Sequence, residues 1–113
     1  MPTQQSTVDY ILDQLSNLTN IRVRKMFGEY ALYCDEKVVG LVCDDQLFIK
    51  ITEPGKLHMG EAYEEGAPYP GAKPYMLIEE LDDRNWLQKL LRVTADVLPL
   101  PKPKKKKTRL LTS

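Results

Sequence analysis

RKMFGEYALY, residues 24–33, is the stretch from which the fold of this chain can be predicted. It leads into three runs rich in β-branched, aromatic and apolar residues: YALYC at 30–34, KVVGLVC at 37–43 and QLFIKI at 46–51. Acidic pairs at 35–36 and 44–45 separate these runs. Short β-rich runs joined by two polar residues are typical of hairpins. The sequence therefore predicts a three-stranded antiparallel meander over residues 30–51, with residues 24–28 leading the chain into the sheet.

Helices are predicted on both sides of the meander. Apolar residues recur at helical spacing from Val8 to Leu18, which predicts a helix over 7–18 with Ser6 as its N-cap and Asp9 completing a variant capping box. A second apolar stripe from Trp86 onward predicts a helix over 83–98, ended by prolines. The fold class is therefore α+β: an antiparallel sheet packed with an N-terminal and a C-terminal helix.

The segment between the meander and the last helix contains shorter elements. Thr52 and Pro54 favour a short helix at 54–60. Three prolines and two glycines exclude helix and central strand from residues 66–75, so a loop is expected there. YMLIE at 75–79 indicates at least one further strand, and Asp82 or Asp83 is expected to cap the last helix.

Both faces of the meander are apolar in the register that two-residue turns impose. One face is predicted to hold Ala31, Tyr33, Val38, Gly40, Val42, Leu47, Ile49 and Ile51, and the other Tyr30, Leu32, Val39, Leu41, Cys43 and Phe48. Either helices cover both faces, or one face binds a partner. The two predicted long helices can cover one face of the sheet more easily than both faces. We therefore hypothesise that the face left open binds a second copy of the chain in a symmetric homodimer.

Charge is distributed unevenly along the chain. The formal net charge is zero, yet six of the 16 basic residues and none of the 16 acidic ones lie in residues 99–113. The remainder, residues 1–98, is predicted to be the folded domain, and the Pro- and Lys-rich segment 99–113 a disordered basic tail. The N-terminus lacks the basic and apolar regions of a signal peptide, and no apolar run is long enough to cross a membrane, so a cytoplasmic location is expected.

The sequence predicts no enzyme, metal site or cofactor. Cys34 and Cys43 lie too far apart in the predicted register for a disulfide, and no Cys/His cluster suggests zinc. His58, the only histidine, has no nucleophile spaced to form a triad with it, and it is expected to be structural or exposed. Acid pairs at 64–65, 79–80 and 82–83 are adjacent in sequence, so their side chains diverge and they make poor catalytic dyads.

The motif at 24–33, the meander and the loop GAPYPGAKPY resemble the N-terminal domain of the TfoX/Sxy family over about residues 8–98. The resemblance implies an α+β fold similar to secretion-chaperone-like domains. It also implies a non-enzymatic cytoplasmic role in bacteria, in the regulation of competence for DNA uptake. The motif positions that carry over are Arg24, Met26, Phe27, Gly28, Tyr30 and Tyr33. Of these, Met26, Phe27 and Tyr33 are expected in the core, whereas Arg24 with Lys25 offers charge, either to a partner or only to solvent at a strand edge.

Two functions follow as hypotheses from these observations. The first is a regulatory or protein-interaction module, with a protein partner or a second copy bound to a sheet face. The alternative is weak, nonspecific binding of nucleic acid through the basic tail, because clustered cations attract phosphates without reading sequence. The tail residues available for such contacts are Lys102, Lys104, Lys105, Lys106, Lys107 and Arg109.

Overall fold

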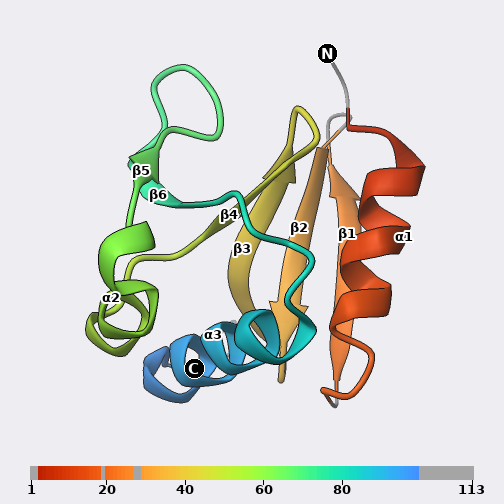
Figure 1. Cartoon of the computed structure of the whole chain (residues 1–113). Coiled ribbons are helices and arrows are strands. Elements are labelled where there is room, and N and C mark those ends of the chain that lie inside the picture. Colours follow the sequence, from red (N-terminus) through yellow and green to blue (C-terminus); the bar gives the residue numbers. More distant parts are fainter. Residues whose placement is uncertain (1–2, 19, 27–28, 100–113) are drawn as a thin grey trace, which may run out of the picture.

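The computed structural model describes residues 3–18, 20–26 and 29–99 (Figure 1). The helices are α1 (Gln5–Gln14), α2 (Glu53–Met59) and α3 (Arg84–Val97), with a short 3₁₀ turn, η1 (Gly60–Ala62), directly after α2. The strands are β1 (Ile21–Met26), β2 (Glu29–Cys34), β3 (Lys37–Cys43), β4 (Gln46–Ile49), β5 (Glu65–Gly66) and β6 (Tyr75–Ile78). The α+β class predicted from the sequence is confirmed.

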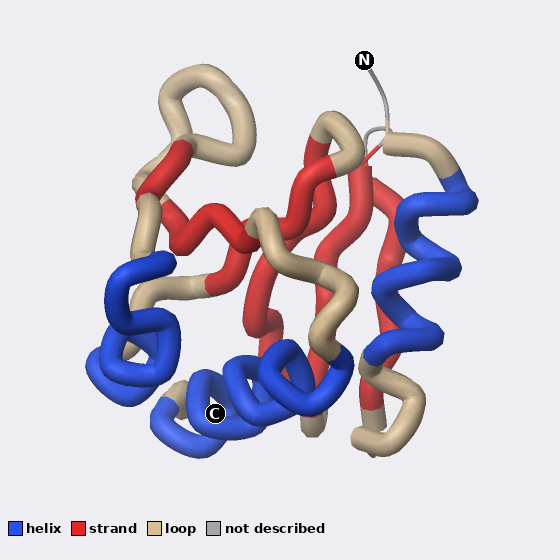
Figure 2. Tube along the Cα trace, viewed as in Figure 1, coloured by secondary structure: helices blue, strands red, loops and turns tan. Residues whose placement is uncertain are grey.

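The strands form one antiparallel sheet in the order β1-β2-β3-β4-β6-β5 (Figure 2). The meander is present as predicted, with Tyr33 opposite Val38 and Val42 opposite Leu47. All four residues of its two acidic turns have φ between 52° and 69°. Positive φ at both central residues defines the type I′ turn, whose twist matches that of the flanking strands. Residues 35–36 and 44–45 are therefore true hairpin turns.

The predicted assignment of residues to the two faces was wrong, because the pairing of β2 with β3 contains a bulge. Leu32 lies opposite Gly40 while Tyr33 lies opposite Val38, so Val39 has no residue opposite it. This extra residue moves Tyr30 and Leu32 to the same face as Val42. Gly40 sits where β4 approaches β3 closely, since a Cβ built there would lie 2.2 Å from the main-chain oxygen of Phe48.

A single core lies between the sheet and the helices. Its buried residues come from one face of β2, β3, β4 and β6, and from all three helices. Val8 and Ile11 of α1, Leu15 directly after α1, and Leu87 of α3 are fully buried in it. Figure 1 shows α1 and α3 in front of the sheet, and in the part of the chain that the structure describes no helix packs on the other face. Of the two alternatives drawn from the sequence, coverage of both faces by helices is wrong.

Two helix caps agree with the sequence and one does not. Thr52 Oγ1 accepts from the main-chain N–H of Gly55 at the start of α2, and Asp83 accepts from that of Trp86 at the start of α3. The predicted cap at Ser6 was wrong, because α1 begins after Gln4. The helix also ends at Gln14 rather than near residue 18. The cap of α1 comes instead from a distant turn, since Asp45 Oδ1 accepts from the main-chain N–H of Gln4 at 2.8 Å.

Candidate interaction surface

The outer face of the sheet, defined as the face opposite the helices, gathers side chains from five strands. Strand alternation and the pairing register place these residues on it: Arg22, Arg24 and Met26 of β1; Glu29, Ala31 and Tyr33 of β2; Leu41 and Cys43 of β3; Phe48 of β4; and Tyr75 and Leu77 of β6. Apart from the two arginines and the glutamate, these side chains are apolar or aromatic. The outer face is therefore a largely apolar surface with charge at its β1 side.

A hollow of about 490 Å³ lies on this face and is lined by Met26, Glu29, Tyr30, Leu41, Cys43 and Tyr69. Tyr69 comes from the proline-rich loop after β5, which thus forms one wall. Its side chain remains 57% exposed, and Met26 is 41% exposed, whereas Pro68 beside Tyr69 is buried. The loop therefore shields part of the outer face while leaving large apolar side chains open to a partner.

Glu29 is the one charged residue in the lining, and its carboxylate is held by the protein. Oε1 accepts hydrogen bonds from the main-chain N–H of Thr3 at 3.2 Å and from the Thr3 hydroxyl, and also from the main-chain N–H of Asp44 at 3.3 Å. These bonds tie the N-terminal segment to the turn between β3 and β4. Glu29 thus closes one end of the hollow as a structural group.

Cys43 contributes a thiol to the lining, and its environment keeps that thiol neutral. Its side chain is only 3% exposed, and burial, followed by the nearby charges of Glu29 and Asp44, raises its pKa to about 11. Burial likewise raises the pKa of Cys34, and both cysteines are free, as predicted. Because the thiolate is the nucleophilic form, Cys43 acts here as an apolar side chain.

The structure separates the motif residues taken from the sequence. Arg24 and Met26 are exposed on the outer face, whereas Tyr30 is buried on the helix side and donates a hydrogen bond to Gln5 Oε1 at 3.0 Å. Phe27 and Gly28 lie outside the described residues. Placing Met26 and Tyr33 in the core was wrong, because strand alternation turns both to the outer face.

Strand β1 is the part of this surface that sequence reasoning missed. In residues 21–26, IRVRKM, three charged residues stand among the β-branched ones and obscure the period-two strand signal. On the outer face the guanidinium carbon of Arg22 lies 4.2 Å from the ring centroid of Tyr33. A guanidinium nitrogen of Arg22 lies 3.6 Å from a carboxylate oxygen of Glu36. Arg24 and Lys25 take part in no ion pair among the described residues, and both are exposed at the strand edge, which fits either of the two alternatives expected, a partner or solvent.

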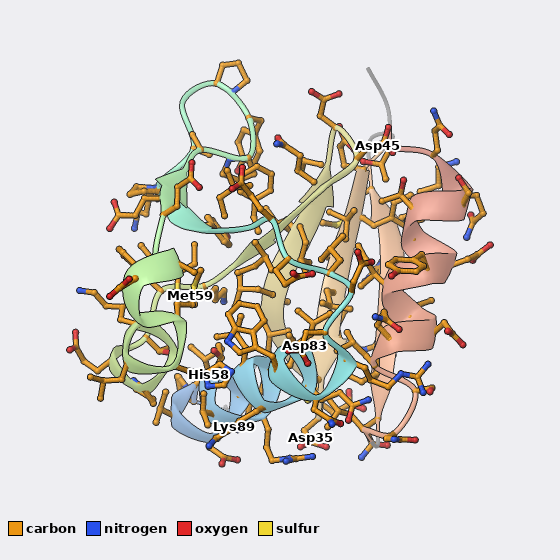
Figure 3. All side chains as sticks on the ribbon, viewed as in Figure 1. Asp35, Asp45, His58, Met59, Asp83 and Lys89 are labelled. Carbon is orange, nitrogen blue, oxygen red and sulfur yellow. The ribbon has the colours of Figure 1, made fainter. Side chains whose placement is uncertain are left out.

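His58 has a structural role between two helices. Its Nε2 lies 2.9 Å from the main-chain oxygen of Trp86. The imidazole ring of His58 also stacks on the indole ring of Trp86, with the ring centroids 5.2 Å apart. A carbonyl oxygen only accepts, so Nε2 donates in this contact. Figure 3 shows His58 on α2 facing α3. In the described part of the chain, no three His, Cys, Asp or Glu side chains gather closely enough to hold a metal ion.

A second hollow, of about 380 Å³, lies between the end of α2 and β6. Its lining combines four glutamates with aromatic and small apolar residues: Met59, Glu61, Ala62, Tyr63, Glu64, Glu79, Glu80 and Trp86. The sequence did not predict that these acids would meet, because they come from separate segments. The hydroxyl of Tyr63 donates to neighbouring Glu65, and this bond is the main reason that the pKa of Tyr63 rises to about 12.

The predicted tail contacts, Lys102 to Arg109, lie outside the described residues. Among the residues that the structure does describe, no helix combines the length and apolar character needed to cross a membrane.

Comparison with known proteins gives two matches. Residues 13–98 match the family model of the TfoX N-terminal domain. The chain is also 46% identical over 110 residues to a protein of Spirochaeta aurantia described as an uncharacterized 12.7 kDa protein in the trpE 5′ region. That alignment covers 96% of this chain and 95% of the relative. The first match spans all of the strands and α3.

Proposed function

Because this chain belongs to the TfoX N-terminal domain family, we propose that it is a small regulatory module that binds proteins and catalyses no reaction. The setting implied by the family is regulation of DNA-uptake competence in the bacterial cytoplasm. In that setting such a module acts through contacts. The observation that supports this proposal is the apolar hollow on the outer face, which exposes Met26 and Tyr69.

Large exposed apolar side chains grouped on one face are characteristic of interaction sites. Here they line a hollow together with Glu29, and Arg22 and Arg24 lie on the same face of the sheet, on strand β1. An apolar centre with a charged rim is the usual anatomy of a protein interface. The neutral thiol of Cys43 adds to the apolar centre, which supports binding rather than covalent chemistry at this site.

A second copy of the chain is the first partner that we propose for the outer face. Symmetric dimers are the commonest oligomers, and each copy would cover the open sheet face of the other. Sedimentation equilibrium at micromolar concentration tests this proposal. We expect a mass about twice the 13.0 kDa of the chain. Met26→Glu and Leu41→Glu should give monomers, since each places a charge in the apolar centre.

Leu57→Glu is the matched control, because Leu57 is 83% exposed on α2, outside the hollow. It should leave the mass unchanged. A wild-type mass of 13.0 kDa at all concentrations would rule out the dimer. Capture of proteins from the native cytoplasm by the immobilised chain then tests for partners other than a second copy. A protein that binds Leu57→Glu but not Leu41→Glu supports the interaction module. Equal capture by both variants would reject the outer face as the binding surface.

Nucleic-acid binding by the basic tail is the second candidate. It is favoured by six basic residues without an acid in residues 99–113, and opposed by the acidic excess of residues 1–98. Nuclease treatment during the capture experiment distinguishes the two functions. Partners held through nucleic acid are lost on treatment, whereas partners bound to the outer face remain.

A further inference from the structure

The β1 edge of the sheet is open. Strand β1 is the end member of the sheet, and no described residue pairs with its outer side. The main-chain N–H of Asp35 donates to the oxygen of Asn20 at 3.2 Å, so these opposed residues form a hydrogen-bonded pair. Bonded and non-bonded pairs alternate along an antiparallel ladder. The main-chain groups of Ile21, Val23 and Lys25 therefore point outward, where they can accept another strand.

The opposite edge of the sheet lacks this property. Strand β5 contains only Glu65 and Gly66, and the proline-rich loop follows directly. Very short edge strands next to prolines are a common protection against unwanted pairing. Strand β1 is six residues long and contains no proline, so the sheet has one protected edge and one open edge.

The side chains of β1 indicate which kind of strand fits there. Arg22 and Arg24 lie on the outer face, and Arg24 is without an ion-pair partner among the described residues. Ile21 and Val23 lie on the helix face, where they are half-buried against the core. An added strand with acids on the outer face and apolar residues on the helix face would complement both sets.

A second copy of the chain is disfavoured at this edge. A symmetric antiparallel pairing centred on Val23 would place Arg22 of each copy opposite Arg24 of the other, and like charges directly opposed destabilise a sheet. Nucleic acid is also disfavoured. Lys25 lies on the other face from the arginines, and Arg22 already contacts Glu36.

We propose that β1 binds an extended acidic segment of another protein, in which acidic and apolar residues alternate, as an added antiparallel strand of the sheet. The main-chain groups of Ile21, Val23 and Lys25 bond to the segment. Its acids lie on the outer face, where they pair with Arg24, which has no ion-pair partner among the described residues, and its apolar residues extend the core beside Ile21 and Val23. None of the residues that bond to or pair with the segment lines the hollow, so the inference does not depend on the proposed function.

A labelled synthetic peptide in which glutamate and valine alternate is the probe, with binding followed by fluorescence anisotropy. In antiparallel addition, the residues opposite Val23 share its face, so the valine amides of the peptide point toward β1. Methylating the valine nitrogens should abolish binding, whereas methylating the glutamate nitrogens should preserve it. Arg24→Glu should weaken binding by about tenfold. Lys89→Glu, the same charge change at an exposed position on α3, should leave binding unchanged.

Several results would overturn the proposal. Binding that survives methylation of the valine nitrogens excludes the antiparallel strand. Equal losses in Arg24→Glu and Lys89→Glu would show attraction by overall charge alone. Binding of single-stranded DNA that requires Arg24, without binding of the peptide, would assign the edge to nucleic acid. Circular dichroism of each variant establishes that it folds, and Arg24 is exposed, so its substitution removes no buried contact.

Discussion

The side-chain amide of Gln88 on α3 donates a hydrogen bond to the main-chain oxygen of Gln14, the last residue of α1, at 2.8 Å. The side chain of Gln14 in turn donates to the main-chain oxygen of Leu81 at 2.7 Å. Both glutamines are buried. The end of α1 is thus joined to the start of α3 by polar contacts inside an otherwise apolar core, because the carbonyl groups of a helix end need partners.

Replacing Gln88 by leucine should destabilise the protein. The change leaves the Gln14 carbonyl without its donor, and an unsatisfied buried polar group costs about 1–3 kcal/mol. Urea unfolding measures the loss. Lys89→Leu, at the exposed neighbouring position, is the control and should change the free energy of unfolding by less than about 0.5 kcal/mol. Equal losses in the two variants would contradict the role given to this bond.

Asp45 should matter as the cap of α1 rather than only as a turn residue. Its carboxylate accepts from Gln4 and from the Thr7 hydroxyl, the latter at 2.9 Å, and its φ is 61°. Asp45→Gly keeps the turn conformation and removes the acceptor, so we expect a loss of about 1 kcal/mol. Asp45→Asn keeps an acceptor oxygen and should lose less than half as much. Thermal unfolding compares them, and identical losses would show that the cap contributes nothing.

Stability should fall between pH 9 and pH 11, partly because of Cys43. The unfolded thiol loses its proton near its ordinary pKa of 9.0, whereas the folded thiol holds it to about 11. In this window the unfolded state binds fewer protons, so the free energy of unfolding decreases as pH rises. Urea unfolding across the window should give a shallower decline for Cys43→Ala than for the wild type. Parallel declines would remove Cys43 as a cause.

Truncation after Leu98 should abolish any binding of nucleic acid. The truncated chain loses Lys102 to Arg109 and keeps the acidic excess of residues 1–98. The full-length chain should retain labelled DNA on a filter at low salt and release it as salt rises, because binding of this kind depends on counterion release. Equal retention by the two proteins would exclude the tail as the contact.

Local pattern was sufficient for most of the secondary structure. Three kinds of feature depend on neighbours in sequence, and all were predicted. They are the turns at 35–36 and 44–45, the caps at Thr52 and Asp83, and the apolar stripe that begins at Val8. β5 was missed because two residues carry no periodic signal. β1 was missed because its three charged residues hide its β-branched ones, Ile21 and Val23.

The candidate surface could be predicted only in part. Two helices and an apolar meander already imply that one face lacks a helical cover. Which residues occupy that face depended on the bulge at Val39, and a shift of one residue exchanges the faces of everything beyond it. The hollow also needed Tyr69, brought from a loop whose path no local pattern describes.

The sequence by itself determined most of the elements, the hairpin turns and the family, because propensity, turn chemistry and motif spacing act between neighbouring residues. The tertiary structure alone decided three things: which face stays open, which edge is free to pair, and how Asp45 comes to cap α1. Each of these depends on contacts between residues far apart in the chain. Such contacts are selected by the packing of the whole core, so the final arrangement follows from the competition of all helices and strands for one apolar interior.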